Sequence, residues 1–150
     1  MTVKISKELS EFNLLYKEMN EIYHIYAKNH GVSDTVLWIL YILSEYGGIC
    51  GQKDICSELH YPAQTVNSAI KWLERRGIVR LETAEENRKN KAVLLTEEGK
   101  KLSESIIAPL VETEDKAFSD LFESERKSLI EVNKKYVKLL SEGILASEKS

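Results

Sequence analysis

The side chains best suited to contact nucleic acid lie on a predicted helix over residues 62–76. Stepping 100° per residue from Val66 places one apolar face inward and an opposite polar face outward. Gln and Asn can each pair with adenine through two hydrogen bonds, Thr offers a methyl group to thymine, and Lys suits phosphate. The exposed residues that we expect to read base edges and phosphates are Gln64, Thr65, Asn67, Ser68 and Lys71.

A charged turn follows this helix, between predicted strands over residues 78–81 and 92–95. An arginine at the tip of such a ribbon can enter a minor groove, where a narrow A·T groove concentrates negative potential. Two glutamates in the turn would repel phosphates, so an ordinary charged hairpin is the competing interpretation. The basic residues of the turn that we expect on DNA are Arg88, Lys89 and Lys91.

A short helix is predicted over residues 53–60, joined to the polar helix by a tight His-Tyr-Pro turn. This arrangement is typical of a helix-turn-helix. The residues at its start, Gln52 and Lys53, could bind backbone phosphate through their side chains and the helix dipole. A polar outer face alone is ordinary for a solvated helix, so the neighbouring helix and ribbon are what favour DNA.

Long amphipathic helices flank this region. Residues 5–28 repeat apolar side chains every three or four positions, and Ser33 or Asp34 caps a second helix that ends at Gly47-Gly48. Thr96 is expected to cap a long helix, and a last helix begins near Ser124. The apolar face of the first helix is so broad that it needs a large partner surface.

Bulk composition fits one cytoplasmic domain of 150 residues with 43% hydrophobic and 30% charged side chains. No apolar run reaches the length of a membrane span, the N-terminus lacks a secretory signal pattern, and two cysteines fit a reducing compartment. Net charge is −3, yet residues 52–91 hold eight Lys/Arg against six Asp/Glu. A slightly basic reading unit in an acidic body is compatible with modest phosphate contact.

Catalytic and metal motifs are missing from the sequence. It contains no Gly-rich phosphate loop, nucleophile elbow or HExxH motif, so neither an enzyme nor a cofactor is expected. The histidines have no Cys or carboxylate partner at a recognisable metal spacing, so no metal site is expected either.

Several motifs together resemble the MarR family of bacterial winged helix-turn-helix transcription regulators. They are Gln64-Thr65-Val66, Leu73-Glu74-Arg75-Arg76-Gly77-Ile78-Val79, Asn87-Arg88-Lys89 and Val93-Leu94-Leu95-Thr96-Glu97-Glu98-Gly99. The resemblance implies a mainly α fold with a small β-ribbon: residues 1–32 and 100–150 form dimerisation helices, and residues 33–99 form the winged helix-turn-helix lobe. Asn87 stands where the family usually has Asp, and Ser68 where it often has Arg.

The resemblance also implies a homodimer that binds a pseudo-palindromic operator in double-stranded DNA as a repressor, relieved by a small, aromatic ligand. The residues in the corresponding ligand segments are Tyr16, Tyr23, His24, Trp38 and Tyr41. Core or interface aromatics are the favoured alternative for this set. Two other functions stay open: a winged-helix module that docks on protein, and a thiol-responsive regulator, although Cys50 and Cys56 fit buried structural cysteines better.

Overall fold

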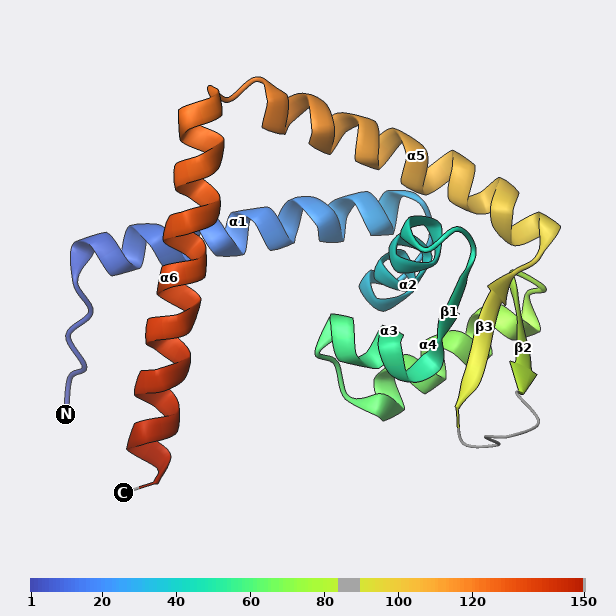
Figure 1. The fold of residues 1–150 in the computed structure, drawn as a ribbon, viewed down its shortest axis with the longest axis horizontal. Helices are drawn as coiled ribbons and strands as arrows, with labels where there is room; N and C mark the ends of the chain where they lie inside the picture. The colour runs from blue at the N-terminus through green and yellow to red at the C-terminus, as the bar shows by residue number, and fades with distance from the viewer. Residues whose placement is uncertain (84–89, 150) are drawn as a thin grey trace. The chain divides into compact units, whose positions relative to one another are not determined.

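The computed structural model describes residues 1–83 and 90–149, which are mainly helical with a small antiparallel sheet (Figure 1). The chain divides into two compact units, Met1–Ala108 and Pro109–Ser150, described separately below. The elements are α1 (Lys7–Asn29), α2 (Asp34–Glu45), β1 (Ile49–Gly51), α3 (Gln52–Leu59), α4 (Ala63–Arg75), β2 (Val79–Thr83), β3 (Lys91–Leu95), α5 (Glu97–Ser119) and α6 (Glu123–Glu148).

Helix α2 forms the centre of the core of the first unit. Ser33, not Asp34, caps it, because the Ser33 hydroxyl oxygen accepts a hydrogen bond from the Val36 N–H at 3.2 Å. Helix α2 contacts α1, α3, α4, β1 and β3. Its fully buried side chains are Leu37, Ile39, Leu40 and Leu43, each 0% exposed.

The sheet has three strands in the order β1-β3-β2, and both pairings are antiparallel (Figure 1). The two-stranded ribbon predicted from the sequence is present as β2 and β3, with Val79 opposite Leu95 and Thr83 opposite Lys91. Strand β1 adds a third, since Cys50 pairs with Val93 on the other side of β3. This pairing ties the start of α3 to the sheet.

Two close backbone approaches fix the sheet to the ends of α4 and α5. Gly77 takes φ +69° directly after α4, a conformation that glycine adopts without strain. Thr96 caps α5: its hydroxyl accepts from the Gly99 N–H at 3.1 Å and donates to the Gly77 carbonyl at 2.5 Å. A Cβ at Gly99 would lie 2.0 Å from the Ile78 carbonyl oxygen, so this position requires glycine.

Helices α1 and α6 leave most of their apolar side chains exposed. In α1, Ala27 is the buried residue, and the Tyr26 hydroxyl donates to the Ile106 carbonyl of α5 at 2.6 Å. In the second unit, none of the residues of α6 is buried. In the part of the chain that the structure describes, no helix combines the length and apolar character needed to cross a membrane.

Candidate nucleic-acid interface

Helix α4 separates its apolar and polar side chains onto opposite faces. Val66 and Leu73 are 0% exposed and Ile70 is 1% exposed, so they anchor the helix against the rest of the unit. All five α4 residues predicted to contact DNA are exposed: Gln64, Thr65, Asn67, Ser68 and Lys71. The predicted amphipathic division is therefore confirmed, and it leaves the polar face accessible to a partner.

The turn between α3 and α4 sets the angle at which α4 is presented. His60 ends α3 with φ 53°, in the left-handed region, and its N–H donates to the Cys56 carbonyl at 3.1 Å. Pro62 stands at the N-cap of α4 and carries no N–H that would need a partner. Two helices joined by so short a turn form a helix-turn-helix.

A groove of about 480 Å³, called the lysine groove below, lies among α3, α4 and the β-ribbon. It brings together five of the predicted DNA-contacting residues from three separate segments: Gln52, Lys53, Asn67, Lys71 and Lys91. The remaining described lining residues are Cys56, Ala63, Ile70 and Leu81, so none of the described lining residues is acidic. Three ammonium groups around one groove favour a polyanion such as the phosphate backbone.

Three of the side chains predicted to contact DNA are held by hydrogen bonds within the protein. The Gln52 amide nitrogen donates to the Asn67 side-chain oxygen, which links the first residue of α3 to α4. On α4, the Ser68 hydroxyl donates to the Gln64 carbonyl at 2.9 Å. The Ser68 oxygen therefore keeps its acceptor capacity, while its proton is used inside the helix.

A second hollow of about 450 Å³ lies on the other side of α4, against the start of α2. Thr65 and Ser68 line it together with Trp72. Sequence reasoning gave Trp72 no role, but the Arg76 guanidinium lies 3.9 Å from the centre of its ring. The signal was their i, i+4 spacing, which brings a cation over an aromatic face on one side of a helix.

Two of the predicted contacts, Arg88 and Lys89, lie outside the described residues. Lys91 begins β3 opposite Thr83, at the end of the β-ribbon that adjoins the turn, and is exposed. On β2, the Arg80 guanidinium pairs with the Glu82 carboxylate at 2.9 Å, which reduces the positive charge of that strand.

The predicted ligand residues fall into three separate places. Tyr23, Trp38 and Tyr41 form one aromatic run between α1 and α2, with ring centres 4.8 Å and 5.6 Å apart. His24 instead pairs through Nδ1 with the Asp34 carboxylate at 2.9 Å. Tyr16 is 58% exposed on α1. The role of this set stays a prediction.

The two thiols have different surroundings. Cys50 is 7% exposed, and burial raises its pKa, with the negative charges of Asp54 and Glu58 adding to the effect. A thiol of raised pKa carries little of the reactive thiolate at neutral pH. Cys56 is half-buried and lines the lysine groove.

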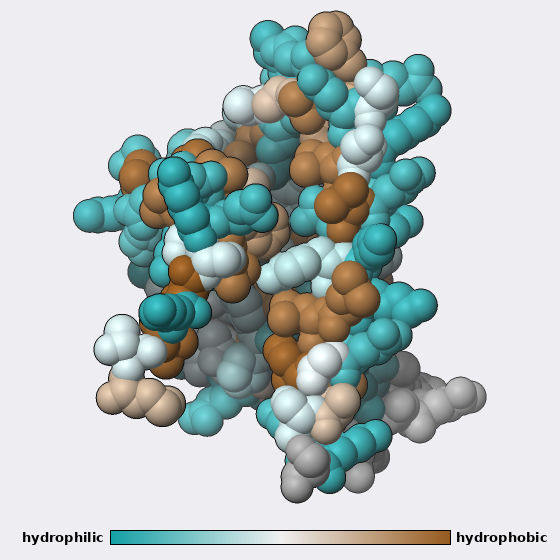
Figure 2. Space-filling view, turned by 90° about the vertical axis from the view of Figure 1, so that its left-hand side faces the viewer, coloured by the Kyte–Doolittle hydropathy of each residue, from teal (hydrophilic) through white to brown (hydrophobic). Residues whose placement is uncertain are grey.

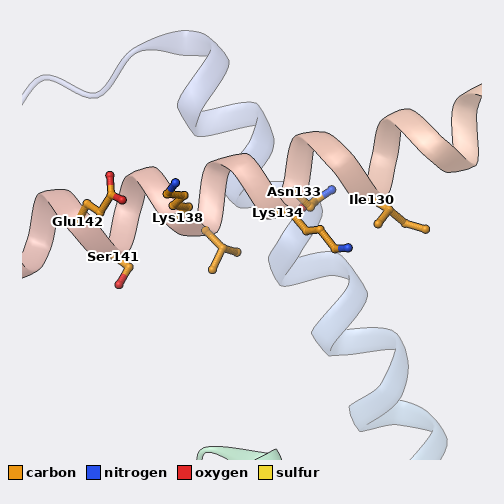
Figure 3. Close-up of a pocket in the computed structure, with 7 residues that line it drawn as sticks. Ile130, Asn133, Lys134, Lys138, Ser141 and Glu142 are labelled. Atoms are coloured by element: carbon orange, nitrogen blue, oxygen red, sulfur yellow. The ribbon is translucent and has the colours of Figure 1, made fainter.

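Other polar clusters and hollows do not form a second candidate site. Near Cys50, the Tyr46 hydroxyl donates to the Glu58 carboxylate, and this bond raises the pKa of Tyr46 to about 12. On α6, a hollow is lined by Ile130, Val137 and polar side chains of that single helix (Figure 3). Within residues 1–83 and 90–149, no group of three or more His, Cys, Asp or Glu residues could hold a metal ion.

The arrangement of helix-turn-helix and wing is matched by a family model described as MarR family, which covers residues 30–89. Over these residues the chain is similar to the MarR family. The alignment with an uncharacterised HTH-type transcriptional regulator of Bacillus subtilis, YwoH, shows 33% identity over 90 residues. It takes in 60% of this chain and 64% of the length of YwoH.

Solved structures agree on the fold. The MarR family regulator NMB1585 from Neisseria meningitidis superimposes with a TM-score of 0.77 at 20% identity, covering 95% of this chain and 99% of NMB1585. A MarR family regulator from Listeria monocytogenes, solved with a 26mer DNA, gives 0.71 at 23% identity, covering 99% and 97%. The predicted fold class, a mainly α winged helix-turn-helix with a small β-ribbon, is thereby confirmed.

Proposed function

We propose that this chain is a cytoplasmic, sequence-specific DNA-binding transcription regulator of the MarR family that acts as a repressor. The observation that carries the proposal is the exposed polar face of α4, bordered by a groove with three lysines. Carboxamide and hydroxyl groups on a helix of this kind suit base edges in a major groove. In a helix-turn-helix the second helix enters the major groove of DNA while the first crosses the DNA backbone, and α4 is the second helix here.

Phosphate contacts would come from the borders of the groove. Lys53 lies on α3 and Lys71 on α4, and Lys91 extends the positive charge to the end of the β-ribbon that adjoins the turn. The start of α3 adds backbone N–H groups that favour an anion. Arg88 and Lys89 are proposed for the flanking minor groove and phosphates on the sequence alone, because the described residues do not include them.

The regulator is proposed to act as a homodimer, with residues 1–32 and 100–150 forming the interface and residues 33–99 the DNA-binding lobe. Exposed apolar side chains line both long terminal helices, and Figure 2 shows such hydrophobic side chains at the surface. They include Leu9, Leu15, Met19 and Ile22 of α1, and Leu129, Val132, Leu139 and Leu140 of α6. Exposed apolar side chains in such numbers are typical of protein interfaces. A two-fold dimer would place two copies of α4 in successive major grooves of a pseudo-palindrome.

The aromatic run between α1 and α2 supports a proposed effector site. Tyr23, Trp38 and Tyr41 offer ring faces and hydroxyl groups to a small aromatic ligand. His24 and Tyr16 belong to the proposed set on sequence grounds. Binding there would relieve repression by changing the spacing of the two α4 helices.

A DNA-binding assay over a salt series tests this function. The full-length protein is mixed with the duplex upstream of its own gene, and with an unrelated duplex of equal length and composition. We expect preferential binding of the upstream duplex and a steep loss of affinity with salt, because lysines displace counterions. Equal, weak binding of both duplexes at low salt would contradict the proposal and favour a module that docks on protein. A small aromatic acid added to the same assay tests the effector.

A further inference from the structure

The hydrogen bond between Gln52 and Asn67 joins two residues that the sequence presents as independent DNA contacts. Gln52 is the first residue of α3, and Asn67 lies on the exposed face of α4. The Gln52 amide nitrogen donates to the Asn67 side-chain oxygen, and both side chains line the lysine groove. We propose that Gln52 is a positioning residue that orients the Asn67 carboxamide and so sets which base Asn67 prefers. The inference rests on the proposed DNA-reading role of α4.

An asparagine whose carboxamide rotates freely does not distinguish a base with a hydrogen-bond donor from one with an acceptor. Its carboxamide has an oxygen acceptor and an amino group with two donors, and rotation about χ2 exchanges the two. With free rotation about χ2, Asn67 could accept from a base amino group as readily as it could donate to a base oxygen. Asparagine on its own therefore discriminates poorly unless a neighbouring group fixes the rotation.

Gln52 supplies that fixed orientation. When the Asn67 oxygen accepts from Gln52, its amino group is directed away from Gln52 and is left to donate. The major-groove edges that offer acceptors are guanine O6 and N7, thymine O4 and adenine N7. Adenine also offers the N6 amino donor, and cytosine offers the N4 amino donor and no acceptor. The pair thus favours a base with an acceptor at the contacted position and disfavours cytosine.

The neighbouring groups do not compete for the same role. Lys53 and Lys71 carry only donors, which suit phosphate and give no preference for one base over another. The side chains of Ala63 and Ile70 carry no polar group. Of the described residues that line this groove, Gln52 is therefore the one whose side chain is hydrogen-bonded to the Asn67 carboxamide.

Gln52→Glu is the decisive variant. A glutamate at this position cannot donate, but it can accept from the Asn67 amino group, which turns the carboxamide over and presents its oxygen to the base. We expect the preferred base at one operator position, in each half-site, to change to one with an amino donor, cytosine or adenine. Gln52→Ala should relax the preference at that same position by roughly tenfold.

The experiment selects bound sequences from a random duplex pool with the full-length protein and with Gln52→Glu, Gln52→Ala, Asn67→Ala and the double variant. Lys53→Ala is the matched control. It should weaken binding to all duplexes alike, and lower the slope of log affinity against log salt concentration by about one, without changing base preference. Because Gln52 acts through Asn67, the double variant should show the same preference as Asn67→Ala. A merely structural role for Gln52 would not move the preference at a single position.

Four outcomes overturn the inference. The first is a uniform loss of affinity in the Gln52 variants, as in the Lys53→Ala control, and the second is a double variant whose effects on preference add. The third is a wild-type protein that enriches no sequence, which overturns the proposed DNA-reading function as well. Enrichment by the wild type with no positional change in the Gln52 variants leaves the proposed function standing and rejects only the positioning role.

Discussion

Helices α2 and α6 are both rich in apolar side chains, yet they use them in opposite ways. Helix α2 has 12 residues and buries six of them against other elements of the first unit. Helix α6 has 26 residues and buries none. Leu40 of α2 is 0% exposed, whereas Leu139 of α6 is 57% exposed. The comparison separates side chains that hold the lobe together from side chains that remain for an assembly.

Helix α4 shows a third use of the same kind of periodicity. It buries Val66, Ile70 and Leu73 and exposes carboxamide, hydroxyl and ammonium groups. Its stability therefore comes from the lobe, while its outer face is left to a partner of different chemistry. An apolar outer face suits a second protein surface, and a polar face with lysines suits DNA.

The largest expected effect is on the free energy of unfolding, from a substitution in the buried helix α2. Leu40→Ala should lower the free energy of unfolding by about 2–5 kcal/mol, because it removes a fully buried side chain and leaves a cavity. Urea denaturation at several protein concentrations measures it, with Leu139→Ala as the exposed control. The division between α2 and α6 would be wrong if Leu40→Ala cost less than Leu139→Ala at every concentration.

A pair of glycines sharpens the comparison at the backbone. Gly99→Ala should lower the free energy of unfolding by about 1–3 kcal/mol, because its Cβ would meet the Ile78 carbonyl oxygen. Gly143→Ala, on α6, meets nothing within 4 Å and should raise it by about 0.5–1 kcal/mol, through helix propensity. Thermal unfolding of both variants gives the sign, and shifts of equal sign would contradict the packing described here.

The apolar face of α6 is tested by introducing a charge. Leu139→Glu should weaken the proposed dimer by at least roughly tenfold, or about 1.4 kcal/mol, because it places a carboxylate in an apolar interface. Sedimentation of a dilution series measures the monomer–dimer equilibrium, with Lys71→Ala on α4 as the control that should leave it unchanged. A wild-type protein that stays monomeric at all concentrations would contradict the proposal that α6 forms part of a dimer interface.

The smallest effect concerns the surface of the lobe, where Tyr46 donates to Glu58 and its pKa is raised to about 12. The folded chain therefore holds this proton to higher pH than the unfolded chain, whose tyrosine has a pKa near 10.0. The resulting contribution to stability is complete below about pH 10 and is lost as the pH rises through about 12.

Glu58→Gln should bring the Tyr46 titration midpoint back towards the ordinary value of 10.0, because it removes the acceptor charge. Ultraviolet absorbance of tyrosinate measures it, and the difference between each protein and its Tyr46→Phe counterpart isolates Tyr46. An unchanged midpoint in Glu58→Gln would show that this hydrogen bond does not set the pKa.

Local features of the fold were predictable because they depend on residues close in sequence. The apolar spacing of Val66, Ile70 and Leu73 indicated the buried face of α4, and Thr96 was identified as the cap of α5. The choice between Ser33 and Asp34 as the cap of α2 needed coordinates, because both side chains are good acceptors.

Features that join distant segments were not predictable from periodicity. Strand β1 pairs with β3 across more than forty residues, and nothing local in Ile49–Gly51 specifies that partner. The bond between Gln52 and Asn67 depends on the angle between α3 and α4, so the sequence showed two separate polar residues. The aromatic segments likewise became a run of three rings only once α1 and α2 were placed together.

The central claim is that the polar face of α4 reads DNA sequence, and an affinity ratio tests it most directly. Fluorescence anisotropy compares a selected duplex with a scrambled duplex at the same salt concentration, for the wild type, Gln64→Ala on α4 and Lys134→Ala on α6. We expect a wild-type ratio of about 10³ or more, reduced roughly tenfold by Gln64→Ala and unchanged by Lys134→Ala. A ratio near one in the wild type, or a ratio that Gln64→Ala leaves intact, would contradict the account.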